Sequence, residues 1–156
     1  MTRGGAVLRA VVVAAAVLVA DQATKALVRG SIGRTERVDV LPGLDLVNTR
    51  NTGVAFGFFS GGGTIVAVVA ALALAALLVF FATHLQRPLV WLPTGLLIGG
   101  AAGNLIDRAR EGAVTDFVDL PLWPAFNVAD AAITIGVLAL LYVLEGPPSR
   151  GDRRQR

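Results

Sequence analysis

The sequence predicts an all-α membrane protein built from four transmembrane helices. Of its 156 residues, 54% are hydrophobic and only 16% are charged, which is too apolar for a soluble domain of this size. Four apolar runs approach the roughly 20 residues that a helix needs to cross a bilayer. No Ser/Pro-rich or charged linker interrupts the interior of the chain, so residues 1–156 are expected to form a single domain.

The membrane spans are assigned to residues 6–28, 62–82, 89–106 and 126–144. In the first run only residues 6–20 are continuously apolar, so the helix spans the bilayer only if it continues past Asp21 and Lys25. A cleaved signal peptide is the alternative, but residues 18–20 lack the small-x-small pattern that precedes a cleavage site. Residues 146–156, rich in Pro and Arg, are expected to form a disordered basic tail.

The one long connection, residues 29–60, is expected to lie outside the bilayer. Its apolar and polar side chains alternate around Pro42 and Gly43, which predicts a small hairpin. It continues into an aromatic-rich stretch, residues 51–59, typical of the headgroup level. The 14 Lys and Arg residues divide evenly between the two sides of the membrane. The inner segments are shorter and carry them at higher density, which favours cytoplasmic termini.

Several polar side chains fall where a helix would cross lipid. At the centre of a span each Asp, Lys or Arg costs roughly 2.5–3.5 kcal/mol, so each needs a reason to be there. Asp21 and Lys25 are four residues apart and are interpreted as a structural ion pair that closes the top of the bundle. Asn104 and Arg108 share a face of the third span, after a Gly-rich stretch that suits close helix packing. They either extend to the interface or line a polar cavity.

Two further acids could meet at the outer end of the bundle. Asp130 lies one turn into the fourth span with Asn127 on the same face, and Asp116 lies in the connection that returns to that membrane face. Two carboxylates in a low-dielectric site cannot both ionise, so one acts as an acid while the other, as a base, activates a water. The alternative is that Asp116 caps a short loop helix and Asp130 pairs with an arginine.

Other hydrolytic chemistries fit the composition less well. The chain has no cysteine, and its single histidine, His84, falls on the opposite side from the acids. Lys25, the single lysine, has no serine at an obvious approach distance. Four aspartates could in principle hold Mg²⁺ or Ca²⁺, namely Asp107, Asp116, Asp119 and Asp130. We expect neither a metal nor a cofactor, and no nucleic-acid partner, because no basic stripe is interleaved with aromatic residues.

Five ordered segments of the chain stand out: residues 21–25, 51–56, 103–108, 114–117 and 126–130. In order and spacing they resemble the motifs of lipoprotein signal peptidases (signal peptidase II), an intramembrane aspartic protease family. The resemblance implies an endopeptidase that removes signal peptides from diacylglyceryl-modified prolipoproteins, cutting before the lipidated Cys. It implies a bacterial inner-membrane enzyme with cytoplasmic termini and an active site near the outer face.

The resemblance also implies roles for individual residues. Asp116 and Asp130 correspond to the catalytic pair, whereas Asp21 and Lys25 match a motif interpreted as structural. The residues implied to bind substrate are Asn51, Asn104, Arg108 and Asn127. A small extracytoplasmic β-element over residues 38–59 and a short outer-face helix complete the expected fold. Membrane lipids and globomycin-type cyclic peptide inhibitors are the further partners that it implies.

Two other functional classes remain as alternatives. A small proton-coupled transporter could relay protons through Asp130 and Asp116. Such a transporter would usually show repeated halves with broken helices at corresponding positions, but only Pro93 interrupts a span. A non-catalytic assembly factor, held together by Gly-rich packing, would leave the Asn, Asp and Arg side chains without a purpose.

Overall fold

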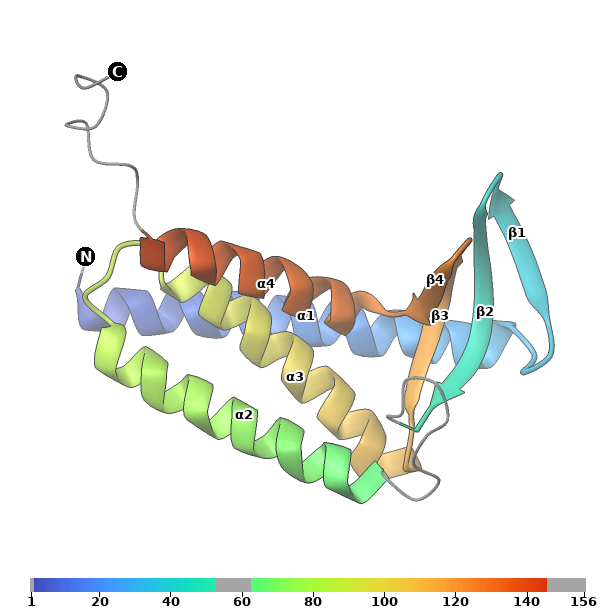
Figure 1. Cartoon of the computed structure of the whole chain (residues 1–156), viewed down its shortest axis with the longest axis horizontal. Coiled ribbons are helices and arrows are strands. Elements are labelled where there is room, and N and C mark those ends of the chain that lie inside the picture. Colours follow the sequence, from blue (N-terminus) through green and yellow to red (C-terminus); the bar gives the residue numbers. More distant parts are fainter. Residues whose placement is uncertain (1, 53–62, 146–156) are drawn as a thin grey trace.

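The computed structural model describes residues 2–52 and 63–145, which form a bundle of four helices with a small sheet at one end (Figure 1). The helices are α1 (Arg3–Ser31), α2 (Gly63–His84), α3 (Trp91–Glu111) and α4 (Val128–Glu145). Helix α1 begins and α4 ends at the end of the bundle opposite the sheet (Figure 1). The four helices overlap all four of the ranges expected from the sequence.

Helix α3 is the centre of the bundle and packs against α1, α2 and α4. Two consecutive glycines let its backbone approach both α1 and α4. A Cβ on Gly99 would lie 2.7 Å from the carbonyl oxygen of Ala14 in α1, and one on Gly100 would lie 2.6 Å from that of Ala129 in α4. Both distances are too short for a real contact, so an alanine at either position would push a neighbouring helix away. The Gly-rich stretch therefore serves helix packing.

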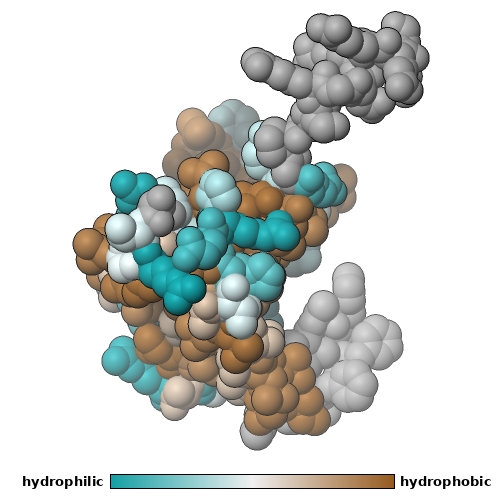
Figure 2. Space-filling view, turned by 90° about the vertical axis from the view of Figure 1, so that its left-hand side faces the viewer, coloured by the Kyte–Doolittle hydropathy of each residue, from teal (hydrophilic) through white to brown (hydrophobic). Residues whose placement is uncertain are grey.

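Three of the helices are long and apolar enough to cross a membrane: α1, residues Ile65–His84 of α2, and α4. Helix α3 is more polar and ends in charged side chains at positions 107, 108, 110 and 111. Large hydrophobic side chains such as Leu72, Val79 and Leu138 are exposed on the outside of the bundle. The end-on view in Figure 2 shows hydrophilic residues gathered on the end facing the viewer and hydrophobic residues around the sides. This is the surface of a bundle whose sides contact lipid.

The sheet is antiparallel, with its strands in the order β1-β2-β3-β4. The strands are β1 (Arg37–Leu41), β2 (Leu44–Asn51), β3 (Val114–Leu120) and β4 (Trp123–Phe126). The expected hairpin around Pro42 and Gly43 is confirmed as β1–β2, and Gly43 supplies the positive φ of 81° in its turn. The second hairpin, β3–β4, comes from the connection between α3 and α4, and the sequence analysis did not predict it.

Several expectations fall on residues that the structure does not describe. The aromatic-rich end of the β-element expected over residues 38–59 lies partly in residues 53–62, and the expected basic tail lies in residues 146–156; both are outside the described residues. Within the described ranges, α1 to α4 are the only helices, so none of them corresponds to the expected short outer-face helix.

Candidate active site

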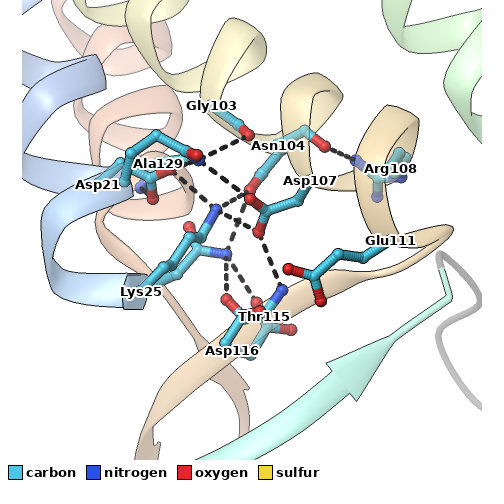
Figure 3. Close-up of polar contacts among 12 residues, drawn as sticks. Asp21, Lys25, Gly103, Asn104, Asp107, Arg108, Glu111, Thr115, Asp116 and Ala129 are labelled. Atoms are coloured by element: carbon cyan, nitrogen blue, oxygen red, sulfur yellow. Dashed lines mark hydrogen bonds and ion pairs between the residues drawn. The ribbon is translucent and has the colours of Figure 1, made fainter. Parts of the chain in front are cut away.

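A buried polar cluster lies at the sheet end of the bundle, with Lys25 of α1 at its centre (Figure 3). The Lys25 Nζ atom lies 2.9 Å from Asp21 Oδ2, 3.1 Å from Asp107 Oδ2 and 2.9 Å from Asn104 Oδ1. These three partners satisfy all three ammonium protons, which makes complete burial of the side chain possible. The ion pair expected between Asp21 and Lys25 is present, and Asp107 joins it as a second carboxylate.

The two carboxylates around Lys25 also tie together elements far apart in the sequence. Asp21 Oδ1 accepts a hydrogen bond from the backbone N–H of Ala129, which joins α1 to the start of α4. Asp107 Oδ2 accepts one from the backbone N–H of Thr115, which joins α3 to β3. Gln22 Nε2 donates to Asp107 Oδ1 at 3.0 Å, between α1 and α3. The cluster therefore fixes three helices and the sheet relative to one another.

Asn104 connects this cluster to the first candidate catalytic acid, Asp130. Because Asn104 Oδ1 accepts from Lys25, its Nδ2 points the other way and donates to Asp130 Oδ1 at 2.8 Å. Asp130 lies in the first turn of α4 and is half-buried. It forms a reciprocal helix cap with Asn127: Asn127 Oδ1 accepts from the Asp130 N–H at 2.9 Å, and Asp130 Oδ2 accepts from the Asn127 N–H at 3.3 Å.

Asn127 also reaches the second candidate acid, Asp116, which lies in β3. Asn127 Nδ2 donates to Asp116 Oδ1 at 2.7 Å, and Asn51 Nδ2 donates to Asp116 Oδ2 at 3.0 Å. Burial raises the pKa of Asp116 to about 6; the charge on Asp130 adds to the shift, whereas the two amide hydrogen bonds and Lys25 oppose it. Asp116 can therefore gain or lose a proton near neutral pH, as an acid–base catalyst must.

The structure thus brings the sequence-predicted site residues into one network. It does not support the alternative in which Asp116 caps a loop helix, because Asp116 lies within a strand. Nor does Asp130 pair with an arginine among the described residues, where its carboxylate is bonded by Asn104 and Asn127. Arg108 lies one turn beyond Asn104, and its buried Nε has no hydrogen-bond partner within the described part of the chain.

Two apolar cavities lie beside the polar cluster. One, of about 420 Å³, lies between α2, α3 and α4 and is lined mainly by aliphatic side chains, with Asn104 and Arg108 at its polar part. The other, of about 370 Å³, lies between the sheet and α4, and its lining includes Trp123 and Asp130. A substrate with apolar parts on both sides of its scissile bond could place one part in each cavity.

Comparison with known proteins identifies the family. The sequence profile of signal peptidase (SPase) II matches residues 13–145. The chain belongs to this family. It is therefore a protease. A lipoprotein signal peptidase of Nitratidesulfovibrio vulgaris is 42% identical, over 90% of this chain and 92% of the relative. One from Pelotomaculum thermopropionicum is 36% identical, over 93% of this chain and 97% of its own length.

Solved structures agree with this assignment. Two structures described as bacterial membrane enzymes each superpose with a TM-score of 0.80, at 32% and 33% sequence identity. The first similarity covers 87% of both chains, and the second covers 86% of this chain and 91% of the other. The helical bundle with its sheet is thus an architecture also found in solved membrane enzymes.

The sequence analysis missed two residues that support the candidate site, Asp107 and Gln22. Asp107 was considered only as a metal ligand, whereas Lys25 and the Thr115 N–H occupy one of its oxygens. Within the described residues, no group of three or more His, Cys, Asp or Glu side chains is arranged to hold a metal ion. Gln22 was quoted in a motif but given no role. Asp107 lies three positions from Asn104 and Gln22 lies three positions from Lys25, and that spacing was the available signal.

Proposed function

We propose that this chain removes signal peptides from diacylglyceryl-modified prolipoproteins, with Asp116 and Asp130 as the catalytic pair. The relatives that share most of its length are lipoprotein signal peptidases, which supports the substrate class. The observation that carries the catalytic assignment is that Asn127 bonds to both acids, so that the two carboxylates belong to one site. Their other described hydrogen bonds come from the amides of Asn51 and Asn104 rather than from a cation.

The raised pKa of Asp116 supports an assignment of the acid role to Asp116 and the base role to Asp130. Asp116 carries the proton, and Asp130, as the carboxylate, takes a proton from a water that attacks the carbonyl carbon of the scissile bond. Asp116 donates its proton to the carbonyl oxygen. When the tetrahedral intermediate collapses, that oxygen returns its proton to Asp116 and the leaving nitrogen accepts one from Asp130. The products are a signal peptide with a free carboxylate and a lipoprotein with an amino-terminal lipidated Cys.

The surrounding polar residues position the acids and the substrate. Asn51 and Asn127 hold Asp116, and Asn104 holds Asp130. Arg108 lines the larger cavity with a buried N–H that lacks a partner among the described residues, and a substrate carbonyl would satisfy it. Globomycin-type cyclic peptides would bind the same site by placing a hydroxyl between the acids. We assign Asp21 and Lys25 to holding the framework.

The arrangement of the bundle supports a placement in the membrane. We assign all four helices as membrane spans within a single domain in the bacterial inner membrane. The ends of α1 and α4 lie at the end of the bundle opposite the sheet (Figure 1). With cytoplasmic termini, the sheet and the acids lie at the outer face, where a lipid-anchored substrate presents its scissile bond. A short outer-face helix would cover this site, and membrane lipids surround the helices.

The proposal is tested by cleavage of a diacylated prolipoprotein by the purified protein in detergent. Mass spectrometry should show the two products of a single cut before the lipidated Cys. Asp116→Asn and Asp130→Asn should each abolish this product, because Asn keeps the shape of Asp but cannot exchange the proton. Asp39→Asn, on the exposed strand β1, is the matched control and should cleave normally. Cleavage by either dyad variant at the wild-type rate would refute the catalytic assignment.

A further inference from the structure

Two leucines have backbone conformations that leucine rarely adopts. Leu89 has a φ of 62° and Leu122 a φ of 64°, and they are the only non-glycine residues with positive φ in the described chain. Both follow a proline, Pro88 and Pro121. A turn with proline followed by a residue of positive φ normally has Gly or Asn at the second position, because a Cβ is unfavourable there. Each leucine therefore costs stability relative to glycine.

Neither leucine recovers this cost by packing inside the protein. The side chain of Leu122 is fully exposed, with a relative accessibility of 105%, and that of Leu89 is 54% exposed. A strained backbone that presents an apolar side chain outward indicates a partner outside the protein. The partner must be apolar at both turns.

The two Pro–Leu turns lie at opposite ends of the bundle. One joins α2 to α3, at the end where α1 begins, and the other joins β3 to β4 in the sheet (Figure 1). Helix α3 separates the two ends; its 21 residues, at a rise of about 1.5 Å each, span roughly 31 Å. This is about the thickness of the hydrocarbon core of a bilayer. Helix α3 is thus long enough to place the two ends of the bundle at the two interfaces.

Each turn is also next to one of the two tryptophans of the chain. Trp123 directly follows Leu122 and is 65% exposed. Trp91 lies two residues after Leu89 and packs against the core, with its Nε1 buried and without a partner among the described residues. The Arg9 guanidinium lies 5.6 Å from the centre of its ring. Tryptophan is enriched at both membrane interfaces because its ring is apolar and its N–H is polar. An arginine beside it suits the anionic headgroups of the inner leaflet.

We propose that the two Pro–Leu turns are lipid anchors, with Leu122 and Trp123 inserted in the outer interface of the bilayer and Leu89 in the inner one. The inference rests on the membrane placement of the proposed function. The exposed face of α4 lies next to the outer anchor, because Ile135 is 57% exposed and lines the same cavity as Trp123. Since Asp130 also lines that cavity, the outer anchor sets the depth of the candidate acid in the membrane.

The outer anchor can be tested by the fluorescence of Trp123. The Trp91→Phe variant leaves Trp123 as the only tryptophan, and it can be reconstituted in phosphatidylcholine vesicles with or without brominated acyl chains. Lipid contact should lower the emission of Trp123 about twofold or more in the brominated vesicles. In the same background, Leu122→Gly should weaken the quenching, because the turn loses its apolar side chain. Its melting temperature in detergent should stay equal or rise, because glycine accepts the positive φ.

The inner anchor provides a matched pair of proteins. Trp123→Phe leaves only Trp91, and Leu89→Gly in that background should weaken the quenching of Trp91 in the same way. Trp123 emission unchanged by brominated lipid, or quenching unchanged by Leu122→Gly, would overturn the outer anchor. If Trp123 were instead shielded in a concentration-dependent dimer, the partner would be a second copy of this chain, and the proposal would also fail. Normal prolipoprotein cleavage in that case would leave the proposed function standing.

Discussion

Two pairs of aspartates lie in one polar network and differ in what they are bonded to. Asp21 and Asp107 both contact the Lys25 ammonium, at 2.9 and 3.1 Å. Among the described residues, Asp116 and Asp130 accept hydrogen bonds only from side-chain amides and a backbone N–H. No cation of the described residues lies within ion-pair distance of either acid. A cation next to a buried carboxylate compensates its charge, whereas amide donors bring no opposite charge to it. The first pair is suited to holding the fold and the second to moving a proton.

The side-chain amide of Asn104 bridges the two pairs, so that Lys25 affects how Asp130 is hydrogen-bonded. Asn104 accepts from Lys25 with its oxygen and donates to Asp130 with its nitrogen. With the amide reversed, Asn104 would place its NH₂ group against an ammonium and its oxygen against a carboxylate, and both contacts would be repulsive. The lysine therefore fixes which atom Asn104 presents to Asp130, without touching that acid.

The largest expected effect is on catalysis by the amide-bonded pair. Asp116→Asn and Asp130→Asn should each lower the cleavage rate by about 10³-fold or more, because each removes one half of a proton exchange. The double variant should be scarcely slower than either single variant, since the two acids act as a unit. Rates on one prolipoprotein substrate measure this. Effects that multiply in the double variant would show that the two acids act independently.

The lysine-bonded pair should instead respond in stability. Lys25→Met removes the charge at similar volume and leaves Asp21 and Asp107 buried without their cation, which should cost about 3–5 kcal/mol of unfolding free energy. Thermal unfolding in detergent measures this loss. The control is Arg37→Met on the sheet, where a 57% exposed guanidinium also bridges two carboxylates. It should change the melting temperature far less, since solvent screens an exposed pair. Equal losses would remove the distinction between the two networks.

The sequence predicted the helices better than the sheet, for a physical reason. Long apolar runs identify membrane helices directly, because lipid requires them. Strand β3 gave no such signal: four consecutive residues from Val114 to Phe117 are buried, so the alternation typical of a half-exposed strand is absent. Its partner β2 is also distant in the sequence, with Asn51 opposite Val114. Residues 114–125 were therefore expected to be only a connection, and Phe126, which ends β4, was expected to begin the fourth span.

The candidate acids could be predicted from their residue types and motifs, but their partners could not. Asp116, Asp130 and the asparagines around them were all singled out from the sequence. The lysine-bonded carboxylates also accept hydrogen bonds from the backbone N–H groups of Thr115 and Ala129. These bonds depend on tertiary packing, which a sequence motif does not encode. The two positive φ values likewise follow from turn geometry at residues whose side chains do not suggest it.

A smaller effect should appear in the pH dependence of stability. The pKa of Asp116 is raised from an ordinary value near 4 to about 6, so the folded state binds more protons than the unfolded state between these values. The stabilisation that this provides is complete below pH 4 and is lost as the pH rises through 6; at about 1.4 kcal/mol per pKa unit it amounts to at most about 3 kcal/mol. The melting temperature of the wild type relative to that of Asp116→Asn should therefore fall as the pH rises from 4 to 8. Parallel curves would contradict the raised pKa.

The smallest effect is expected for an acid on the same strand as Asp116 but with a different partner. Asp119 lies three residues further along β3, is 20% exposed, and has its Oδ2 2.6 Å from Arg37 Nη2. It is thus bonded to a cation, as Asp21 is, but at the surface, where such a pair contributes little. Asp119→Asn should leave the cleavage rate and the melting temperature within measurement error of wild type, because Arg37 keeps Asp45 as its second partner. The same two assays used for Asp116→Asn make the comparison direct. A large loss of cleavage by Asp119→Asn, with folding intact, would contradict this comparison. It would show that an acid of β3 can be needed for catalysis even though it is paired with a cation.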